Sequence, residues 1–194
     1  LPLRDNVPSR RFPVVTLMIV VANVLLFLFE VMMGQNAAAL TESFGVVPAR
    51  LIGNWYNPVV LFTLFSSMYL HGGWAHLIGN MWYLLIFGDN IEDRMGRLGY
   101  FIFYTLCGVA AALIQVAVAP RSEIPMIGAS GAIAGVLGAY LLLYPGARVS
   151  MLVPVFYSFR IIWLPAILVL GGWFLVQLLN GLAMLNVQMM TGGV

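Results

Sequence analysis

The chain has 194 residues, of which 62% are hydrophobic and only 8% are charged, and its formal net charge is +2. A mean hydropathy of +0.97 indicates more apolar surface than a soluble domain can bury, which favours a polytopic membrane protein. The positive charge is too small and too scattered to indicate binding to nucleic acid, and the single cysteine, Cys107, excludes an internal disulfide.

Apolar segments follow one another along the whole chain. A membrane-spanning helix needs roughly 20 mostly apolar residues, and five segments are candidates: 14–33, 73–87, 98–119, 128–144 and 161–182. Residues 1–13 are polar and precede the first span, and residues 34–70 form a long loop on the other side. We therefore predict that residues 1–194 form a single all-α domain, a polytopic membrane helix bundle.

The nine basic residues are all arginines, and they are unevenly divided between the two ends of the predicted spans. Arg50 and Arg121 lie on one side, and the other seven lie on the side of the N-terminus: Arg4, Arg10, Arg11, Arg94, Arg97, Arg148 and Arg160. The positive-inside rule then predicts a cytoplasmic N-terminus. Five spans would leave the C-terminus outside, and we expect the native polypeptide to continue past Val194 into a sixth span.

Two of the connecting loops carry further information. The loop 34–70 is too apolar for free solvent, and we expect Trp55 and Tyr56 to lie at the depth of the lipid headgroups. The segment 88–97 is short and charged, and Gly88 is a candidate C-cap for the second span. We expect its acidic residues to be solvated and paired with nearby arginines: Asp89, Glu92 and Asp93 with Arg94 and Arg97.

A few polar side chains are predicted to lie at membrane depth, where such groups are candidates for function. His76 and Asn80 are four residues apart and therefore share a helix face. Ser130 opens the fourth span. His76 lies about 16 Å, and Ser130 about 20 Å, from the inner end of its own helix. Both helices run in the same direction, so these two side chains are predicted to lie at similar depth.

Small residues surround Ser130. Gly131 and Gly135 are four residues apart, which lets membrane helices approach closely and suits the fourth helix to the centre of the bundle. Gly128 and Gly131 free the backbone next to Ser130. The start of a helix has unpaired N–H groups and the positive end of the dipole, a setting that can stabilise an oxyanion.

Each of these residues also has a purely structural interpretation. Ser130 could cap the helix or form a hydrogen bond between helices, and His76 with Asn80 could serve packing. His71 lies at the edge of the loop and suits a structural hydrogen bond. Two histidines without a nearby carboxylate on the inner side do not make a zinc site, which usually has three or four protein ligands, so we predict no metal and no cofactor.

Taken together, three stretches resemble the rhomboid family of intramembrane serine proteases. They are "RRFPVVT" (10–16), "SSMYLHGGWAHLIGNMWYLLIFGDNIEDRMG" (66–96) and "GASGAIAGVLGAY" (128–140). The pattern H-x4-H-x3-N followed by G-x-S-G is far more specific than either part alone. Helix order, the long first loop and the pattern of polarity agree over essentially the whole chain.

The resemblance implies a reaction and a role for each of these residues. Ser130 would be the nucleophile that hydrolyses a peptide bond in or near a transmembrane segment of another membrane protein. His76, Asn80 and the Ser130 N–H would form the oxyanion hole. The remaining site residues would support it, His71 from the loop edge and the two glycines by shaping the turn: Gly128 and Gly131.

The chain also departs from the family pattern. The family's catalytic base is a histidine on a sixth helix, and the stretch "PVVLFTLF" stands where many relatives carry a Trp-Arg pair. Three interpretations follow: an active protease whose chain continues, an inactive relative that binds membrane helices, or a subunit of a larger membrane complex. We expect the first, in a bacterial inner membrane, with the lipid bilayer and transmembrane substrates as partners.

Overall fold

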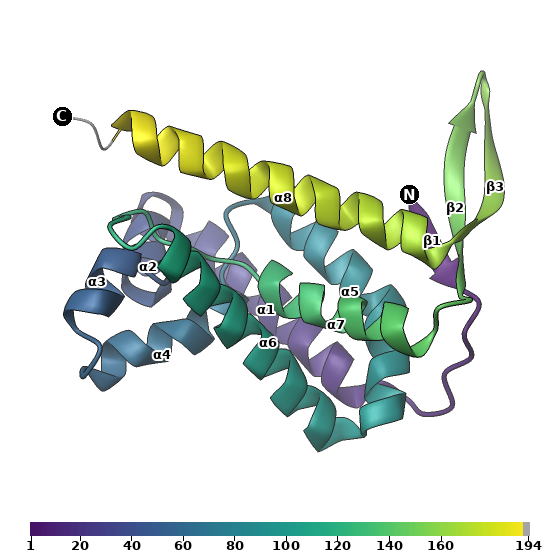
Figure 1. The fold of residues 1–194 in the computed structure, drawn as a ribbon, viewed down its shortest axis with the longest axis horizontal. Coiled ribbons are helices and arrows are strands. Elements are labelled where there is room, and N and C mark those ends of the chain that lie inside the picture. Colours follow the sequence, from purple (N-terminus) through teal and green to yellow (C-terminus); the bar gives the residue numbers. More distant parts are fainter. Residues whose placement is uncertain (192–194) are drawn as a thin grey trace.

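The computed structural model describes the backbone of residues 1–191 and the side chains of residues 1–183. Helices make up most of this part of the chain (Figure 1), and the predicted helical bundle is confirmed. The long helices are α1 (Val14–Met33), α5 (Trp74–Met95), α6 (Arg97–Val118), α7 (Ser130–Leu143) and α8 (Ala166–Thr191). Shorter ones lie between α1 and α5: η1 (Gly34–Asn36), α2 (Ala37–Phe44), α3 (Pro48–Gly53), α4 (Pro58–Ser66) and η2 (Ser67–Tyr69).

Three helical stretches of the described residues are long and apolar enough to cross a membrane: 14–44, 97–118 and 166–183. Helix α5 ends in a charged turn, and α7 has only 14 residues. The first predicted span, 14–33, coincides with α1, and the other four overlap α5, α6, α7 and α8. The number of helices that cross the bilayer remains a prediction.

Helix α7 occupies the centre of the bundle, where it contacts α5, α6 and α8. One face of α7 is completely buried, with the side chains of Ala132, Ile133, Val136, Leu137 and Tyr140. On the side that faces α6, the glycines of α7 let the two helices pack closely against each other. A Cβ atom at Gly131 would lie 2.5 Å from the Cβ of Ala111, and one at Gly135 would collide with Cys107. The small residues of α7 therefore permit the central position that the sequence predicts.

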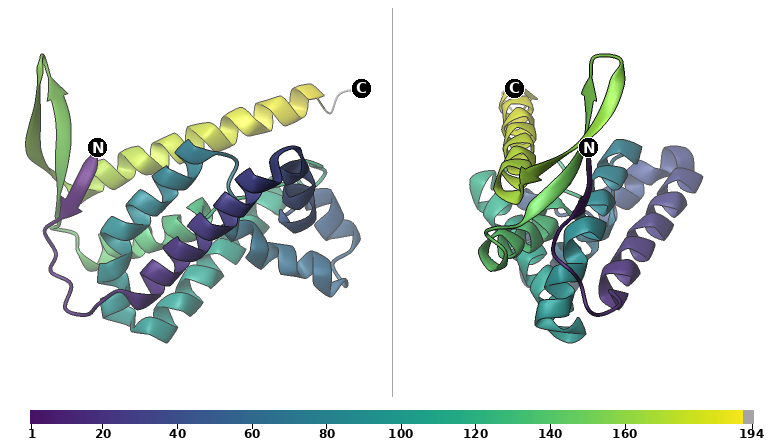
Figure 2. Two further views of the ribbon diagram at one scale, coloured as in Figure 1. Left: turned by 180° about the vertical axis from the view of Figure 1, so that it is seen from behind. Right: turned by 90° about the vertical axis from the view of Figure 1, so that its right-hand side faces the viewer.

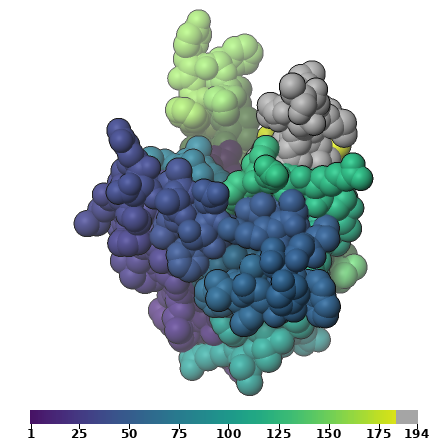
Figure 3. All heavy atoms as spheres, turned by 90° about the vertical axis from the view of Figure 1, so that its left-hand side faces the viewer, coloured from purple at the N-terminus to yellow at the C-terminus, as the bar shows by residue number. Residues whose placement is uncertain are grey.

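The long loop between α1 and α5 is largely helical. Helices α2, α3 and α4 cover one end of the bundle (Figure 3), together with the segment that leads into α7. Trp55 and Tyr56 project from this end with 71% of their surface exposed. Asn57 begins α4 by accepting a hydrogen bond from the Val59 N–H through its side chain.

The charged segment 88–97 differs from the sequence prediction. Helix α5 continues through it to Met95, and Gly96, with a φ of 74°, is its C-cap. Gly88 is not a C-cap: it lies buried inside the helix, where a Cβ would be 2.7 Å from the Tyr100 hydroxyl. Gly88 is thus needed for close packing with α6, and the chain turns at the next glycine that can adopt a positive φ.

Glu92 is not a solvated loop residue either, since only 4% of its surface is exposed. Its carboxylate accepts hydrogen bonds from the backbone N–H groups of Val15 and Thr16, at 2.9 and 2.8 Å, and from the Thr16 hydroxyl at 2.9 Å. Asp93, by contrast, lies near the exposed Arg11 at 3.8 Å. Glu92 therefore satisfies the free N–H groups at the start of α1 from a different helix.

A three-stranded antiparallel sheet, which the sequence patterns did not predict, lies at the end of the bundle that carries the N-terminus. Its strands are β1 (Pro2–Asp5), β2 (Arg148–Val155) and β3 (Ser158–Pro165), in that order. Residues 161–165, predicted as the start of the fifth span, belong to β3, and α8 begins at Ala166 after Pro165. Figures 1 and 2 show that the β2–β3 hairpin extends away from the helices.

Candidate active site

Ser130 is the first residue of α7 and is half-buried. The preceding residue, Ala129, occupies the N-cap position, and no side chain caps the helix there. The N–H groups of the first turn are therefore without helical partners. Gly128 has a φ of +123°, which favours glycine. Its N–H donates to the carbonyl of Ser67 at 2.8 Å, which ties the turn to η2.

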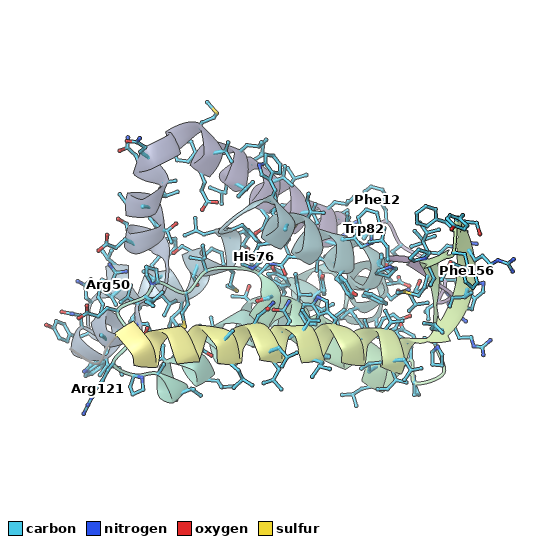
Figure 4. All side chains as sticks on the ribbon, turned by 90° about the horizontal axis from the view of Figure 1, so that it is seen from above. Phe12, Arg50, His76, Trp82, Arg121 and Phe156 are labelled. Atoms are coloured by element: carbon cyan, nitrogen blue, oxygen red, sulfur yellow. The ribbon has the colours of Figure 1, made fainter. Side chains whose placement is uncertain are left out.

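His76 lies directly against this turn. A Cβ atom at Gly128 would be 2.7 Å from both Cε1 and Nε2 of the His76 ring, and 3.9 Å from Nδ2 of Asn80. Both side chains come from α5, one helical turn apart. Figure 4 labels His76 inside the bundle, between the end that carries Arg50 and Arg121 and the end that carries Phe156. The absence of a side chain at Gly128 thus makes room for the histidine ring, two residues before Ser130.

His71 and Asn80 form a buried polar pair, with 3% and 2% of their surfaces exposed. Asn80 Nδ2 lies 3.0 Å from His71 Nε2. An amide nitrogen can only donate, so Nε2 is the acceptor and the neutral ring carries its proton on Nδ1. The His71 ring also packs edge-on against the ring of His76, with centroids 5.0 Å apart. His71 therefore fixes Asn80 directly and supports His76 by packing.

The protonation of His71 follows from its surroundings. It lies in the connection between η2 and α5, outside the helices. Burial disfavours the charged ring, and the neighbouring His76 adds to this effect. Together they lower the pKa of His71 from 6.5 to about 4. His71 is therefore neutral at pH 7, which is the form that can accept the hydrogen bond from Asn80.

Glu30 of α1 is a residue of this network that sequence reasoning did not single out. Only 5% of its surface is exposed, and its Oε2 accepts a hydrogen bond from the backbone N–H of His71 at 3.2 Å. Within the described part of the chain, Glu30 Oε1 and His71 Nδ1 are both buried without a hydrogen-bond partner. A lone carboxylate inside an otherwise apolar span was the signal that could have revealed it.

The structure brings four of the six predicted site residues into contact: His71, His76, Asn80 and Gly128. Ser130 follows Gly128 by two residues as the first residue of α7. Gly131 follows Ser130, but the position of its missing side chain faces Ala111 of α6. Its contribution is close helix packing. The described residues contain no group of three histidine, cysteine, aspartate or glutamate side chains arranged to hold a metal ion.

An apolar groove of about 430 Å³ lies between the α8 helix, the α5 helix and the base of the hairpin. Its walls include Tyr83 of α5, Leu164 of β3 and Trp173 of α8. The rings of Tyr83 and Trp173 meet with their centroids 5.6 Å apart. The groove marks a place where α8 and α5 are only partly in contact.

Comparison with known proteins identifies the family to which this arrangement belongs. The chain is 34% identical over 88 residues to "Rhomboid-like protein 11, chloroplastic" of Arabidopsis thaliana. The matched region covers 45% of this chain and 29% of the relative. It is 30% identical over 132 residues to "Rhomboid protease GluP" of Bacillus subtilis (strain 168), covering 66% and 24%. It is 30% identical over 95 residues to "Rhomboid protein 1, mitochondrial" of Saccharomyces cerevisiae, covering 47% and 28%.

These matches cover between 24% and 29% of the relatives' own lengths. The family model of the Rhomboid domain matches residues 58–191, which is more than half of the chain and contains the segments of His71, His76, Asn80 and Ser130. The chain therefore belongs to the rhomboid family.

Proposed function

We propose that this protein is an intramembrane serine protease in which Ser130 is the nucleophile. The observation that carries the proposal is the position of His76 and Asn80 against the Gly128 turn, at the N-terminus of α7. Attack by a serine turns the carbonyl oxygen of the substrate into an oxyanion, which hydrogen-bond donors must stabilise. His76 and Asn80 lie against Gly128, two residues before Ser130 and the start of α7. The similarity to a protein named as a rhomboid protease also supports it.

In the proposed reaction, Ser130 Oγ attacks the carbonyl carbon of a peptide bond, and the carbonyl oxygen becomes an oxyanion. The Ser130 N–H, the ring of His76 and Asn80 Nδ2 would stabilise that charge. Asn80 uses one amide hydrogen for His71 and keeps the second for the oxyanion. The acyl-enzyme then forms as the amine leaves, and water hydrolyses it.

The Ser130 hydroxyl proton needs a base, because a serine is a weak nucleophile without one. His71 is hydrogen-bonded to Asn80, and His76, which lies against the Gly128 turn, has the role of an oxyanion donor in this proposal. We therefore assign neither as the base and expect it to be the histidine of the sixth helix that the family resemblance implies.

The groove between α5 and α8 is the proposed route for the substrate. A transmembrane segment could enter from the lipid at this place, since its walls are apolar and α8 runs along one side of the bundle (Figure 1). Helical segments hide their carbonyl groups in hydrogen bonds, so substrates are expected to carry small or helix-breaking residues near the cleaved bond.

The test is cleavage of a reporter protein with one transmembrane segment by the full-length protein in lipid vesicles. Ser130→Ala should abolish cleavage, and Ser43→Ala, at an exposed serine of α2, should leave it unchanged. Loss of activity should occur without a change in thermal stability. Cleavage by Ser130→Ala at the normal rate would refute the assignment. An inactive wild-type protein that retains a bound membrane partner would favour the role of a non-catalytic binding protein.

We further propose a bacterial inner membrane as the location, with the N-terminus in the cytoplasm and cleavage near the outer face. The uneven distribution of arginines supports the orientation. Relatives named as chloroplastic and mitochondrial show that the family also occurs in organelles.

A further inference from the structure

The tip of the β2–β3 hairpin carries large aromatic side chains without cover. Phe156, Tyr157 and Phe159 are 97%, 106% and 71% exposed. Val155 pairs with Ser158, so Phe156 and Tyr157 form a two-residue turn. Such turns favour asparagine and glycine, yet Phe156 adopts a φ of 53°. Aromatic residues do not favour this turn, so we infer that their rings serve to contact something outside the protein chain.

Both faces of the hairpin are apolar beyond its base. Residues directly opposite each other in an antiparallel pair share a face. Pro154 with Phe159, and Leu152 with Ile161, lie on one face; Met151 with Ile162, and Val153 with Arg160, lie on the other. Met151 packs against the core at the base of the hairpin. The apolar surface next to the tip is formed by Leu152, Val153, Phe159, Ile161 and Ile162. A solvated hairpin would carry polar side chains on at least one face.

The position of the hairpin relates this surface to the membrane. The hairpin connects α7 to α8, two helices of the bundle, and it stands across the long direction of the bundle (Figure 1). The end-on view in Figure 2 shows it extending sideways beyond the helices. A ribbon at the end of a membrane bundle, directed sideways, runs along the surface of the bilayer.

The hairpin itself carries charges of one sign, and the nearest carboxylate of the sheet, Asp5 of β1, lies at its base opposite Val149. Residues 146–183 contain no aspartate or glutamate, and their two charged residues are Arg148 and Arg160, both exposed. Arg4 of β1 lies over the ring of Trp163, 5.8 Å from its centroid. Aromatic rings with arginines are the composition of segments that lie in the membrane interface, and cations there attract anionic lipids.

We propose that the β2–β3 hairpin is a membrane-interface anchor that inserts Phe156, Tyr157 and Phe159 among the lipids and binds anionic phospholipid headgroups through Arg148 and Arg160. It extends the footprint of the bundle on the side of the N-terminus, next to the base of α8. The unpaired edge of β3 could also pair with a second copy of the chain. The sideways direction and the two arginines of the hairpin, which has no acidic residue, favour lipid.

The test uses a fluorophore attached at the tip. Tyr157→Cys is made in a Cys107→Ala background of the full-length protein, labelled, and reconstituted in phosphatidylcholine vesicles with and without phosphatidylglycerol. Quenching by a nitroxide lipid is compared with quenching by aqueous acrylamide. Pro8→Cys, in the exposed N-terminal segment at the same end, is the matched control.

We expect the probe at residue 157 to be quenched several-fold more strongly by the nitroxide lipid than the probe at residue 8, and less by acrylamide. Phosphatidylglycerol should increase the lipid quenching, Arg160→Gln should reduce that increase, and Arg148→Gln combined with Arg160→Gln should remove it. Equal exposure of both probes to acrylamide would overturn the proposal. Protection from both quenchers, with energy transfer between labelled copies, would overturn it in favour of a contact between two copies.

Discussion

At the scale of single residues, the site depends on the space that Gly128 leaves. His76 occupies the volume that any larger residue at this position would need, and the backbone has a φ that favours glycine. The i, i+4 spacing of His76 and Asn80 predicted their common helix face correctly. No local spacing could predict that Glu30 belongs to the site, because its hydrogen bond with His71 joins residues that are 41 positions apart in the chain.

Gly128→Ala is expected to reduce cleavage of the transmembrane reporter by about 100-fold or more, the usual cost of losing one oxyanion donor. The new Cβ would lie 2.7 Å from the His76 ring and displace it. Initial rates in vesicles measure the effect. Gly79→Ala, in the same helix as His76 but with open space around its Cβ position, should keep the normal rate. Equal rates for both variants would show that the position of His76 is not needed.

At the scale of elements, two helix contacts hold the site in place. Helix α7 presents Ser130 from the centre of the bundle because its glycines let α6 approach. Helix α5 presents His76 and Asn80, and its far end binds the start of α1 through Glu92. The positions of the helices were predictable from apolar runs, whereas these contacts were not, since a sequence pattern does not show which helices are neighbours.

Gly135→Ala is expected to destabilise the protein by about 1–3 kcal/mol, the usual cost of overpacking. Its Cβ would collide with Cys107 of α6, whereas Gly138, one turn further along α7, has open space. Gly138→Ala should therefore be neutral or slightly stabilising. Thermal unfolding in detergent measures both variants. An unchanged melting temperature for Gly135→Ala would contradict the close packing of α6 and α7.

Glu92→Ala is expected to lower the free energy of unfolding by about 2–3 kcal/mol, because it leaves buried N–H groups of α1 without their charged acceptor. The comparison is Asp93→Ala, where the carboxylate faces the exposed Arg11 and a surface ion pair is worth about 1 kcal/mol or less. Denaturant titration of both variants gives the difference. Similar losses would show that Glu92 does not cap α1.

At the scale of the whole molecule, the bundle has two chemically different ends. Arg50 and Arg121 lie at the end covered by the short helices, and Phe156 lies at the other (Figure 4). The segments that contain the remaining seven arginines adjoin the N-terminal strand, the end of α5 and the hairpin. The arginines are thus divided unequally between the two ends of the bundle, and the positive-inside rule assigns the end with more of them to the cytoplasm.

The orientation is tested with single cysteines in the Cys107→Ala background. Gln35→Cys, in η1, should react with an impermeant maleimide in intact cells, because η1 lies at the end that carries fewer arginines. Pro8→Cys should react only after the cells are opened, since we expect the N-terminus in the cytoplasm. Both residues are exposed, so accessibility does not limit either reaction. The reverse pattern of labelling would show that the orientation is wrong.

The sequence by itself determined the membrane class, the approximate places of the long helices, the shared face of His76 and Asn80, and the position of Ser130 at a helix start. Each of these depends on residues that are near one another in the chain, through hydropathy and helical period. The pattern H-x4-H-x3-N in residues 66–96, together with G-x-S-G in residues 128–140, identified the family, and the family model confirms it.

Only the tertiary structure decided the burial of Glu92, the contact of Glu30 with His71, the interior position of Gly88 and the sheet that joins residues 2–5 to 148–165. The physical reason is that each of these arises from groups far apart in sequence, such as the 76 positions between Thr16 and Glu92. Their partners are chosen by how the helices pack, and no local pattern contains that choice.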